Sequence, residues 1–154
     1  MAFVLPAAPN VADTVETAVA DWPVKPIVLH ATDEQARTEK TAAFFAADVA
    51  IAASGTVSLE LAAANTPMVV AYDMNWLSRH LVTRMLRVDT VTLVNLVSET
   101  RAVPEFLGAD CRPDLIAPAV LDLLQHRQSQ DYAMALTMQR LGQGGEAPGL
   151  RAAR

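Results

Sequence analysis

Ser54, Gly55 and Thr56 stand where a short apolar segment, residues 49–52, gives way to a helical pattern that includes Glu60. A strand that leads directly into a helix presents free backbone N–H groups and a partial positive charge to a ligand, which suits a phosphate or another anion. Gly55 lets a ligand approach the backbone closely, and Glu60, one helical turn further on, offers a carboxylate to a ribose diol. These residues predict a nucleotide site. The alternative is a capped helix with a solvated glutamate.

Asn95 and Glu105 form a second candidate pair. Asn95 lies at the end of a predicted strand, where its amide could bind a ligand, and Glu105 follows Pro104, which favours the start of a helix. The alternative is that both side chains only stabilise their own surroundings, as an asparagine in a loop and a glutamate at a helix N-terminus often do. The residue types alone favour this local role.

Short apolar segments alternate with helical patterns along the chain, which is typical of an α/β fold with a parallel sheet covered by helices on both faces. Asn10 is the expected cap of the first helix, and a turn is expected at residues 65–67. The strands are predicted at residues 2–5, 27–29, 49–52, 68–72 and 90–94, and the helices at 10–20, 34–47, 56–64, 76–86, near Glu105, at 114–125 and at 130–140, so that the C-terminal part is mostly helical.

Ser54, Tyr72 and Asn95 each lie at or just after the carboxyl end of a predicted strand. Ligands of open parallel sheets bind beyond these ends. We therefore expect the three side chains to share one crevice.

The predicted helix at residues 76–86 has a basic arc next to Trp76 and an apolar arc opposite. Such a helix could rest on an anionic membrane surface. The more common arrangement, an apolar side packed on the core, is the alternative. The basic arc contains Arg79, His80, Arg84 and Arg87.

The composition limits the classes of function. With 154 residues, of which 52% are hydrophobic, the chain suits one folded domain, and it has no apolar run long enough to span a membrane. A net charge of −5 argues against indiscriminate nucleic-acid binding. The single Cys111 fits a reducing cytoplasm and is expected to be an inert thiol. It forms no metal-ligand spacing with His30, His80 or His126, so no metal or other cofactor is expected.

Three segments in the same order closely resemble bacterial lipid-A-disaccharide synthase, a glycosyltransferase family of the GT-B type, which is built from two Rossmann-like domains. They are Ala53-Ser-Gly-Thr-Val-Ser-Leu-Glu-Leu-Ala62, Asn65-Thr-Pro-Met-Val-Val-Ala-Tyr72, and Val94-Asn-Leu-Val97 followed by Val103-Pro-Glu-Phe106. The resemblance covers about residues 1–140 and matches only the C-terminal, UDP-sugar-binding half. It implies a partial domain at residues 1–141. The stretch rich in glycine and polar residues that follows, and the helical pattern that restarts at Leu150, predict a flexible linker and a truncated terminal helix at residues 142–154.

The resemblance implies transfer of 2,3-diacylglucosamine from UDP-2,3-diacylglucosamine to 2,3-diacylglucosamine 1-phosphate (lipid X), which yields UDP and a β-1,6-linked disaccharide phosphate on the way to lipid A. The family's acceptor-side domain, expected to supply the catalytic base, is absent, so an inactive fragment is expected. Peripheral contact with the inner membrane and self-association are further expectations. By likeness, Ser54, Gly55 and Thr56 face the pyrophosphate, Glu60 the ribose, and Asn95 and Glu105 the donor end, with Tyr72 lining the same pocket.

The chain also departs from the family's pattern. Family members often have Pro-Asn-Leu-Leu-Ala-Gly-Arg-Glu where residues 94–101 read Val-Asn-Leu-Val-Ser-Glu-Thr-Arg, and no role is assigned to Glu99 or Arg101. Two alternatives stay open. One is an enzyme of the UDP-N-acetylglucosamine 2-epimerase type, which shares a related fold but usually has a doubled glycine in this loop. The other is an inactive nucleotide-binding remnant.

Overall fold

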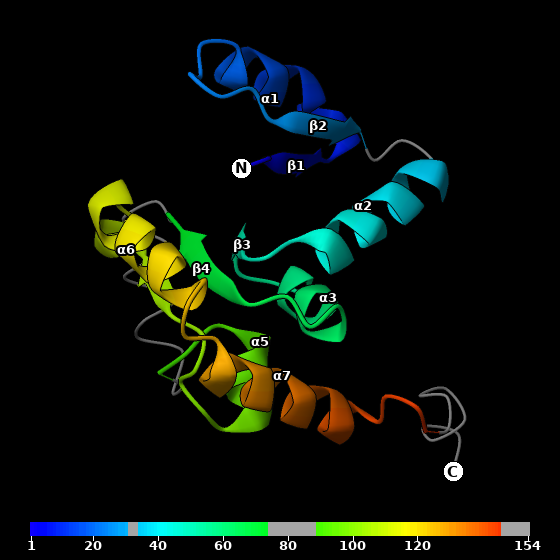
Figure 1. The fold of residues 1–154 in the computed structure, drawn as a ribbon, viewed down its shortest axis with the longest axis vertical. Coiled ribbons are helices and arrows are strands. Elements are labelled where there is room, and N and C mark those ends of the chain that lie inside the picture. The colour runs from blue at the N-terminus through cyan, green and yellow to red at the C-terminus, as the bar shows by residue number, and fades with distance from the viewer. Residues whose placement is uncertain (31–33, 74–88, 146–154) are drawn as a thin grey trace. The chain divides into compact units, whose positions relative to one another are not determined.

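A computed structural model describes residues 1–30, 34–73 and 89–145, which form two compact units, Met1–Ala46 and Ala47–Arg154 (Figure 1). Each unit is α/β with parallel strands, which confirms the predicted fold class. The predicted helix at residues 76–86 and the predicted terminal helical segment lie outside the described residues. None of the described helices combines the length and apolar character that a membrane-spanning helix needs.

The first unit has two parallel strands, β1 (Val4–Ala7) and β2 (Ile27–His30), with Val4 opposite Ile27. They are joined through the 3₁₀ helix η1 (Pro9–Val11) and α1 (Ala12–Val19), and α2 (Glu34–Ala46) contacts β2. The prediction that Asn10 caps the first helix is wrong. Asn10 lies within η1, and no side chain caps α1, because the chain enters it directly from the 3₁₀ turn.

The second unit is built on three parallel strands in the order β3-β4-β5. Met68, Val69 and Val70 of β4 are completely buried, as expected for a central parallel strand with apolar residues facing both sides. The predicted strand at residues 68–72 is confirmed. The strands are β3 (Ala50–Ala52), β4 (Met68–Tyr72) and β5 (Glu105–Leu107).

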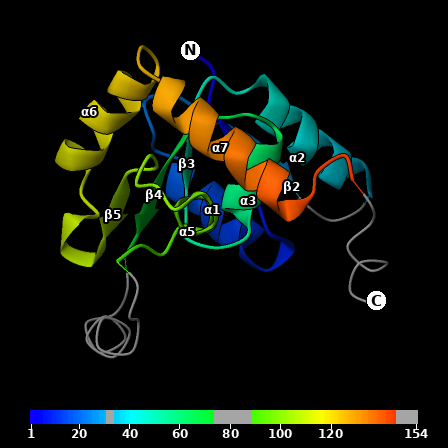
Figure 2. The same ribbon diagram turned by 90° about the horizontal axis from the view of Figure 1, so that it is seen from below.

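Helices of the second unit pack together around a shared apolar core. Leu61 of α3 (Val57–Ala63), Val94 of α5 (Leu93–Ser98) and Met134 of α7 (Gln128–Leu141) are each at most 1% exposed. Figure 2 shows α7 running beside α3 and α5, with which it is in contact. The 3₁₀ helix η2 (Gly108–Asp110) follows β5 and leads to α6 (Pro113–Leu123), which packs against β4.

Two elements predicted between residues 90 and 106 are wrong. Residues 90–92 form no strand, because the backbone N–H groups of Val91 and Thr92 donate to the Glu105 carboxylate instead of to a neighbouring strand. The helix predicted near Glu105 is replaced by β5, which begins at Glu105. Val70 N–H donates to Pro104 C=O, and this bond extends the sheet to the segment.

The predicted turn before β4 is confirmed, and its geometry explains the residue types. Asn65 adopts a left-handed conformation with φ 56°, which asparagine tolerates better than most residues. The N–H of Thr66 donates to Leu61 C=O and the N–H of Asn65 to Ala62 C=O, which is the Schellman arrangement that ends a helix. The chain therefore leaves α3 in a fixed direction and enters β4 at once.

Gln130 of α7 takes the place of a strand beside the start of β4. Its Oε1 accepts from Met68 N–H at 2.8 Å, and its Nε2 donates to Met68 C=O at 2.9 Å. Both groups point toward the β5 side, as those of Val70 do two residues later, but the β4–β5 pairing starts only at Val70 and Glu105. Gln130 itself is completely buried. It therefore satisfies two backbone groups that the short β5 leaves unpaired.

We predict that Gln130→Ala lowers the free energy of unfolding by about 2–5 kcal/mol, because it leaves the buried N–H and C=O of Met68 without partners. Urea unfolding measures the loss. Gln139→Ala, at an exposed position of the same helix, is the matched control and should change stability by less than about 0.5 kcal/mol. Equal stabilities of the two variants would contradict the role given to Gln130.

Candidate functional site

The loop between β3 and α3, formed by Ser54, Gly55 and Thr56 and called here the Ser54 loop, reaches the carboxyl edge of the sheet. Gly55 has φ 143°, a conformation that side chains disfavour, and a Cβ built on it meets no described atom within 4 Å. The space above Gly55 is thus open in the described part of the chain. The first bonds of the helix run from Ser58 N–H to Gly55 C=O and from Leu59 N–H to Thr56 C=O. The N–H groups before Ser58 precede these bonds, as at any helix start.

The hydroxyls of the Ser54 loop differ in their surroundings. Ser54 is half-buried, and its Oγ donates to Val91 C=O at 3.2 Å. A hydroxyl that donates to a carbonyl retains only acceptor lone pairs, so Ser54 must release Val91 before it can donate to a phosphate. Thr56 is exposed and does not cap α3 with its side chain. Ser58 Oγ donates to Gly55 C=O at 2.9 Å.

Glu60 and Tyr72 lie on neighbouring elements. Glu60 is exposed on α3, one turn after Thr56. Tyr72 is the last residue of β4 and is 41% exposed. Ala52 pairs with Val70, so Ser54 and Tyr72, each two residues further along, come to the same edge of the sheet. The structure thus brings four of the predicted residues, Ser54, Gly55, Thr56 and Tyr72, to this edge, with Glu60 on the adjoining helix.

Asn95 is not at the end of a strand, so its predicted placement is wrong. It lies in α5 and is 1% exposed. Its Oδ1 accepts from Val103 N–H at 3.0 Å, and its Nδ2 donates to Val103 C=O at 2.9 Å and to Thr90 Oγ1 at 3.2 Å. These contacts support the local, stabilising role, whereas direct contact of Asn95 with a ligand stays a prediction.

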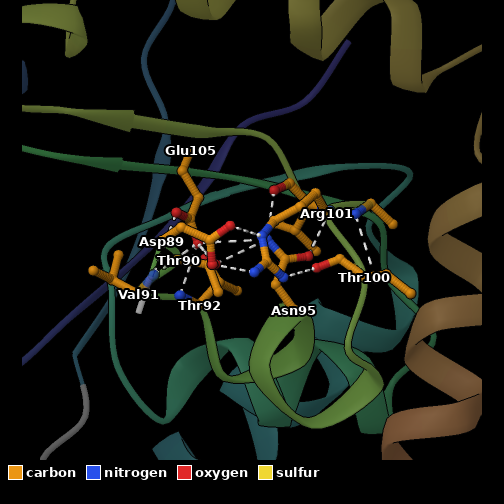
Figure 3. Close-up of polar contacts among 10 residues, drawn as sticks. Asp89, Thr90, Val91, Thr92, Asn95, Thr100, Arg101 and Glu105 are labelled. Carbon is orange, nitrogen blue, oxygen red and sulfur yellow. Dashed lines mark hydrogen bonds and ion pairs between the residues drawn. The ribbon is translucent and has the colours of Figure 1, made fainter. Parts of the chain in front are cut away.

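Glu105 gathers the donors of the segment that precedes α5 (Figure 3). Its Oε1 accepts from Thr92 N–H at 2.8 Å, from Val91 N–H at 3.1 Å and from the Thr90 hydroxyl. Asn95 Nδ2 approaches the same oxygen at 3.5 Å. Because several donors converge on one carboxylate, residues 90–92 are held against the start of β5. Direct contact of Glu105 with the donor sugar stays a prediction.

The pKa of Glu105 is lowered from its ordinary value. Burial alone would raise this pKa, but the hydrogen bonds from Thr90, Thr92 and Val91 together outweigh it. The buried Thr92 hydroxyl also lowers this pKa, although it lies within hydrogen-bond distance of no described partner. Glu105 is therefore held as a carboxylate at neutral pH.

An ion pair closes the same segment from outside. Arg101 donates through Nε to Asp89 Oδ2 at 3.1 Å and through Nη2 to Asp89 Oδ1, and through Nη1 to Thr100 C=O (Figure 3). The hydrogen bond from Arg101 is the largest cause that lowers the pKa of Asp89. Both side chains are largely exposed, so the pair adds little stability. Sequence reasoning assigned no role to Arg101, because a pairing across twelve residues has no local signal.

Glu99 ends α5 in the left-handed conformation, with φ 59°. This is the position at which family members often have glycine, and the structure supplies a physical reason, since glycine adopts this conformation without a steric cost. The Glu99 carboxylate lies 3.6 Å from Arg140, in an exposed pair. At this position the chain thus keeps the left-handed conformation but has a glutamate, which adopts it less readily than glycine does.

The described residues contain no group of three His, Cys, Asp or Glu side chains that could hold a metal ion. His30 lies 3.1 Å from Glu16 and His126 lies 2.8 Å from Asp122, in separate exposed pairs. His80 lies outside the described residues, and Cys111 is half-buried with a free thiol.

A family model described as lipid-A-disaccharide synthetase matches residues 11–148. The chain belongs to this family. Curated relatives named lipid-A-disaccharide synthase include those of Ruegeria pomeroyi, 56% identical, and Paramagnetospirillum magneticum, 42% identical, each aligned over 99% of this chain. The relative from Rhodospirillum centenum is 44% identical over 97% of this chain. The chain spans only 39% of the length of the first two relatives and 37% of the third.

Membership in the lipid-A-disaccharide synthase family decides against the UDP-N-acetylglucosamine 2-epimerase type. It also agrees with the resemblance of the Ser54 loop and of the segments around Tyr72, Asn95 and Glu105. The roles of these individual residues in ligand binding stay predictions.

We predict that Glu105→Gln lowers the free energy of unfolding by about 1–3 kcal/mol at neutral pH, since an amide cannot accept every donor that converges on the carboxylate. The folded pKa lies below the ordinary value of 4.5. The carboxylate's contribution is therefore complete above that value and is lost as the pH falls through the lower, folded pKa. The stability difference between the parent chain and Glu105→Gln should shrink on acidification.

Urea unfolding at neutral pH and near pH 3 measures this change. Asp110→Asn, at an exposed carboxylate close to β5, is the control and should show a small difference at both pH values. A stability difference for Glu105→Gln that stays constant across this range would refute the charged contact.

A second prediction concerns Glu99. Both Glu99→Gly and Glu99→Ala remove the exposed contact with Arg140, but only glycine relieves the left-handed backbone. Glu99→Gly should therefore be more stable than Glu99→Ala by about 1 kcal/mol in thermal or urea unfolding. An alanine variant as stable as the glycine variant would show that the conformation at this residue carries no strain.

Proposed function

We propose that this chain is the UDP-sugar-binding part of a lipid-A-disaccharide synthase. In the proposed reaction, 2,3-diacylglucosamine passes from UDP-2,3-diacylglucosamine to 2,3-diacylglucosamine 1-phosphate, with UDP as the leaving group. The family match and the relatives' names support this reaction. The single structural observation that supports a ligand role for this chain is the open space above Gly55 at the carboxyl edge of the sheet.

The Ser54 loop is proposed to receive the pyrophosphate of UDP. Backbone N–H groups at the start of α3 would bind the phosphate oxygens, and Gly55 leaves room for them to approach. Glu60, exposed on the same helix, would accept hydrogen bonds from the ribose hydroxyls. Donors fixed in this way stabilise negative charge as it develops on the departing UDP.

The acceptor sugar and the catalytic base are proposed to lie in the part of the relatives that this chain does not match. The chain spans 39% of the length of the relative from Ruegeria pomeroyi. We propose that the chain alone binds the nucleotide but does not form the disaccharide. A cytoplasmic location with peripheral contact to the inner membrane, where the lipid substrates reside, is part of the same proposal, as is self-association through exposed apolar surface.

Isothermal titration of the purified chain with UDP tests the proposed site. The parent chain should bind UDP, and two variants should each weaken binding about tenfold: Ser54→Ala, which removes the contact between the loop and Val91, and Glu60→Ala, which removes the proposed acceptor for the ribose hydroxyls. Ser129→Ala, at an exposed position of α7, is the control and should bind like the parent.

The outcomes separate the proposals. Unchanged UDP affinity in both site variants would place the nucleotide elsewhere. A parent chain that folds but binds no UDP would contradict both the proposed UDP-sugar-binding role and the alternative of an inactive nucleotide-binding remnant. A measurable rate of disaccharide formation by the chain alone would contradict the proposed need for the remaining part of the enzyme.

A further inference from the structure

The peptide bond between Val91 and Thr92 connects Glu105 to the Ser54 loop. Its N–H, on Thr92, donates to Glu105 Oε1 at 2.8 Å, and its C=O, on Val91, accepts from Ser54 Oγ at 3.2 Å. A trans peptide is planar, so its N–H and C=O point in opposite directions and cannot rotate independently. Glu105 and Ser54 therefore hold the same rigid group from its two sides.

We infer that Glu105 is a positioning residue, which fixes the Val91–Thr92 peptide to which the Ser54 hydroxyl is anchored and so holds the Ser54 loop in place for its ligand. This inference rests on the proposed function for the identity of that ligand, the diphosphate of UDP. It assigns Glu105 a role different from direct contact with the donor sugar.

The other contacts of Glu105 restrict the peptide further. The carboxylate also accepts from Val91 N–H, at 3.1 Å to Oε1 and 3.3 Å to Oε2, so two successive N–H groups bind the same side chain. The hydroxyl of Thr90, a residue that is 1% exposed, donates to Oε1 as well. Because these donors bind one carboxylate, the Val91–Thr92 peptide has one favourable orientation, and its C=O points toward the Ser54 hydroxyl.

Charge strengthens the connection. A carboxylate that accepts from a peptide N–H polarises the peptide and makes its carbonyl oxygen a better acceptor. Val91 C=O is that oxygen, and it holds the Ser54 proton. The Ser54 hydroxyl therefore anchors the loop to Val91, and loss of the charge on Glu105 weakens this anchor.

Amide hydrogen exchange on the chain without ligand tests the positioning itself. In Glu105→Gln the amides of residues 58–60, which donate to Gly55 and Thr56 C=O, should exchange about tenfold faster relative to the amides of α6, because Val91 holds the loop less firmly. Thr90→Val, which removes only one donor to Glu105, is a milder variant and should shift exchange in the same direction if Glu105→Gln does not fold. Gln130→Ala destabilises the same unit without touching this peptide and should leave the ratio unchanged.

A double-mutant cycle in UDP affinity tests the connection to the ligand. We expect Ser54→Ala to weaken UDP binding about tenfold, Glu105→Gln about fivefold, and the double variant by no more than about tenfold, because Glu105 acts through Ser54. Gln130→Ala, which destabilises the same unit elsewhere, should bind UDP like the parent. Weaker binding by Glu105→Gln is then not a consequence of lower stability alone.

Each result decides one part. A double variant weakened about fiftyfold, the product of the single effects, would overturn the inference, and so would unchanged exchange at residues 58–60 in both Glu105→Gln and Thr90→Val. If exchange changes as expected but the parent chain binds no UDP, the positioning of Ser54 by Glu105 stands and the proposed function fails.

Discussion

The convergence of backbone and hydroxyl donors on the carboxylate of Glu105 determines much of the second unit. It draws residues 90–92 out of the sheet, fixes them against the start of β5, and places Val91 C=O where the Ser54 hydroxyl meets it. Asn95 reinforces the same corner by spanning the backbone of Val103. The same corner leads into α5, which begins at Leu93, and contacts the Ser54 loop through Val91.

Elements with purely local signals could be predicted from the sequence. The strand at residues 68–72 has a continuous apolar run after a turn that contains asparagine and proline, and the structure has it with the same limits. The strand predicted at residues 90–94 was wrong. The β-branched residues of this segment suggest a strand, but the N–H groups of Val91 and Thr92 donate to Glu105, which lies more than ten residues later in the sequence. Such a competitor is visible only once the fold brings the two segments together.

The candidate site shows the same division. The Ser54 loop follows from a strand, a glycine and a helix that are adjacent in sequence, and the structure places them as expected. Asn95 and Glu105 were both singled out, but their mutual contact depends on β5, which the sequence suggested as a helix. Gln130 was missed, although a signal existed: with Ala133, Met134 and Thr137 it occupies the buried side of α7, where a polar residue requires a partner.

The contact made by Gln130 has a consequence for variation within the family. Gln130 binds only main-chain atoms of residue 68. Every amino acid except proline carries both of these atoms, so substitutions of Met68 are limited by the volume of the core and leave this contact intact. Position 130 has no such latitude, because few side chains present a donor and an acceptor side by side. Evolutionary drift should therefore be far slower at 130 than at 68.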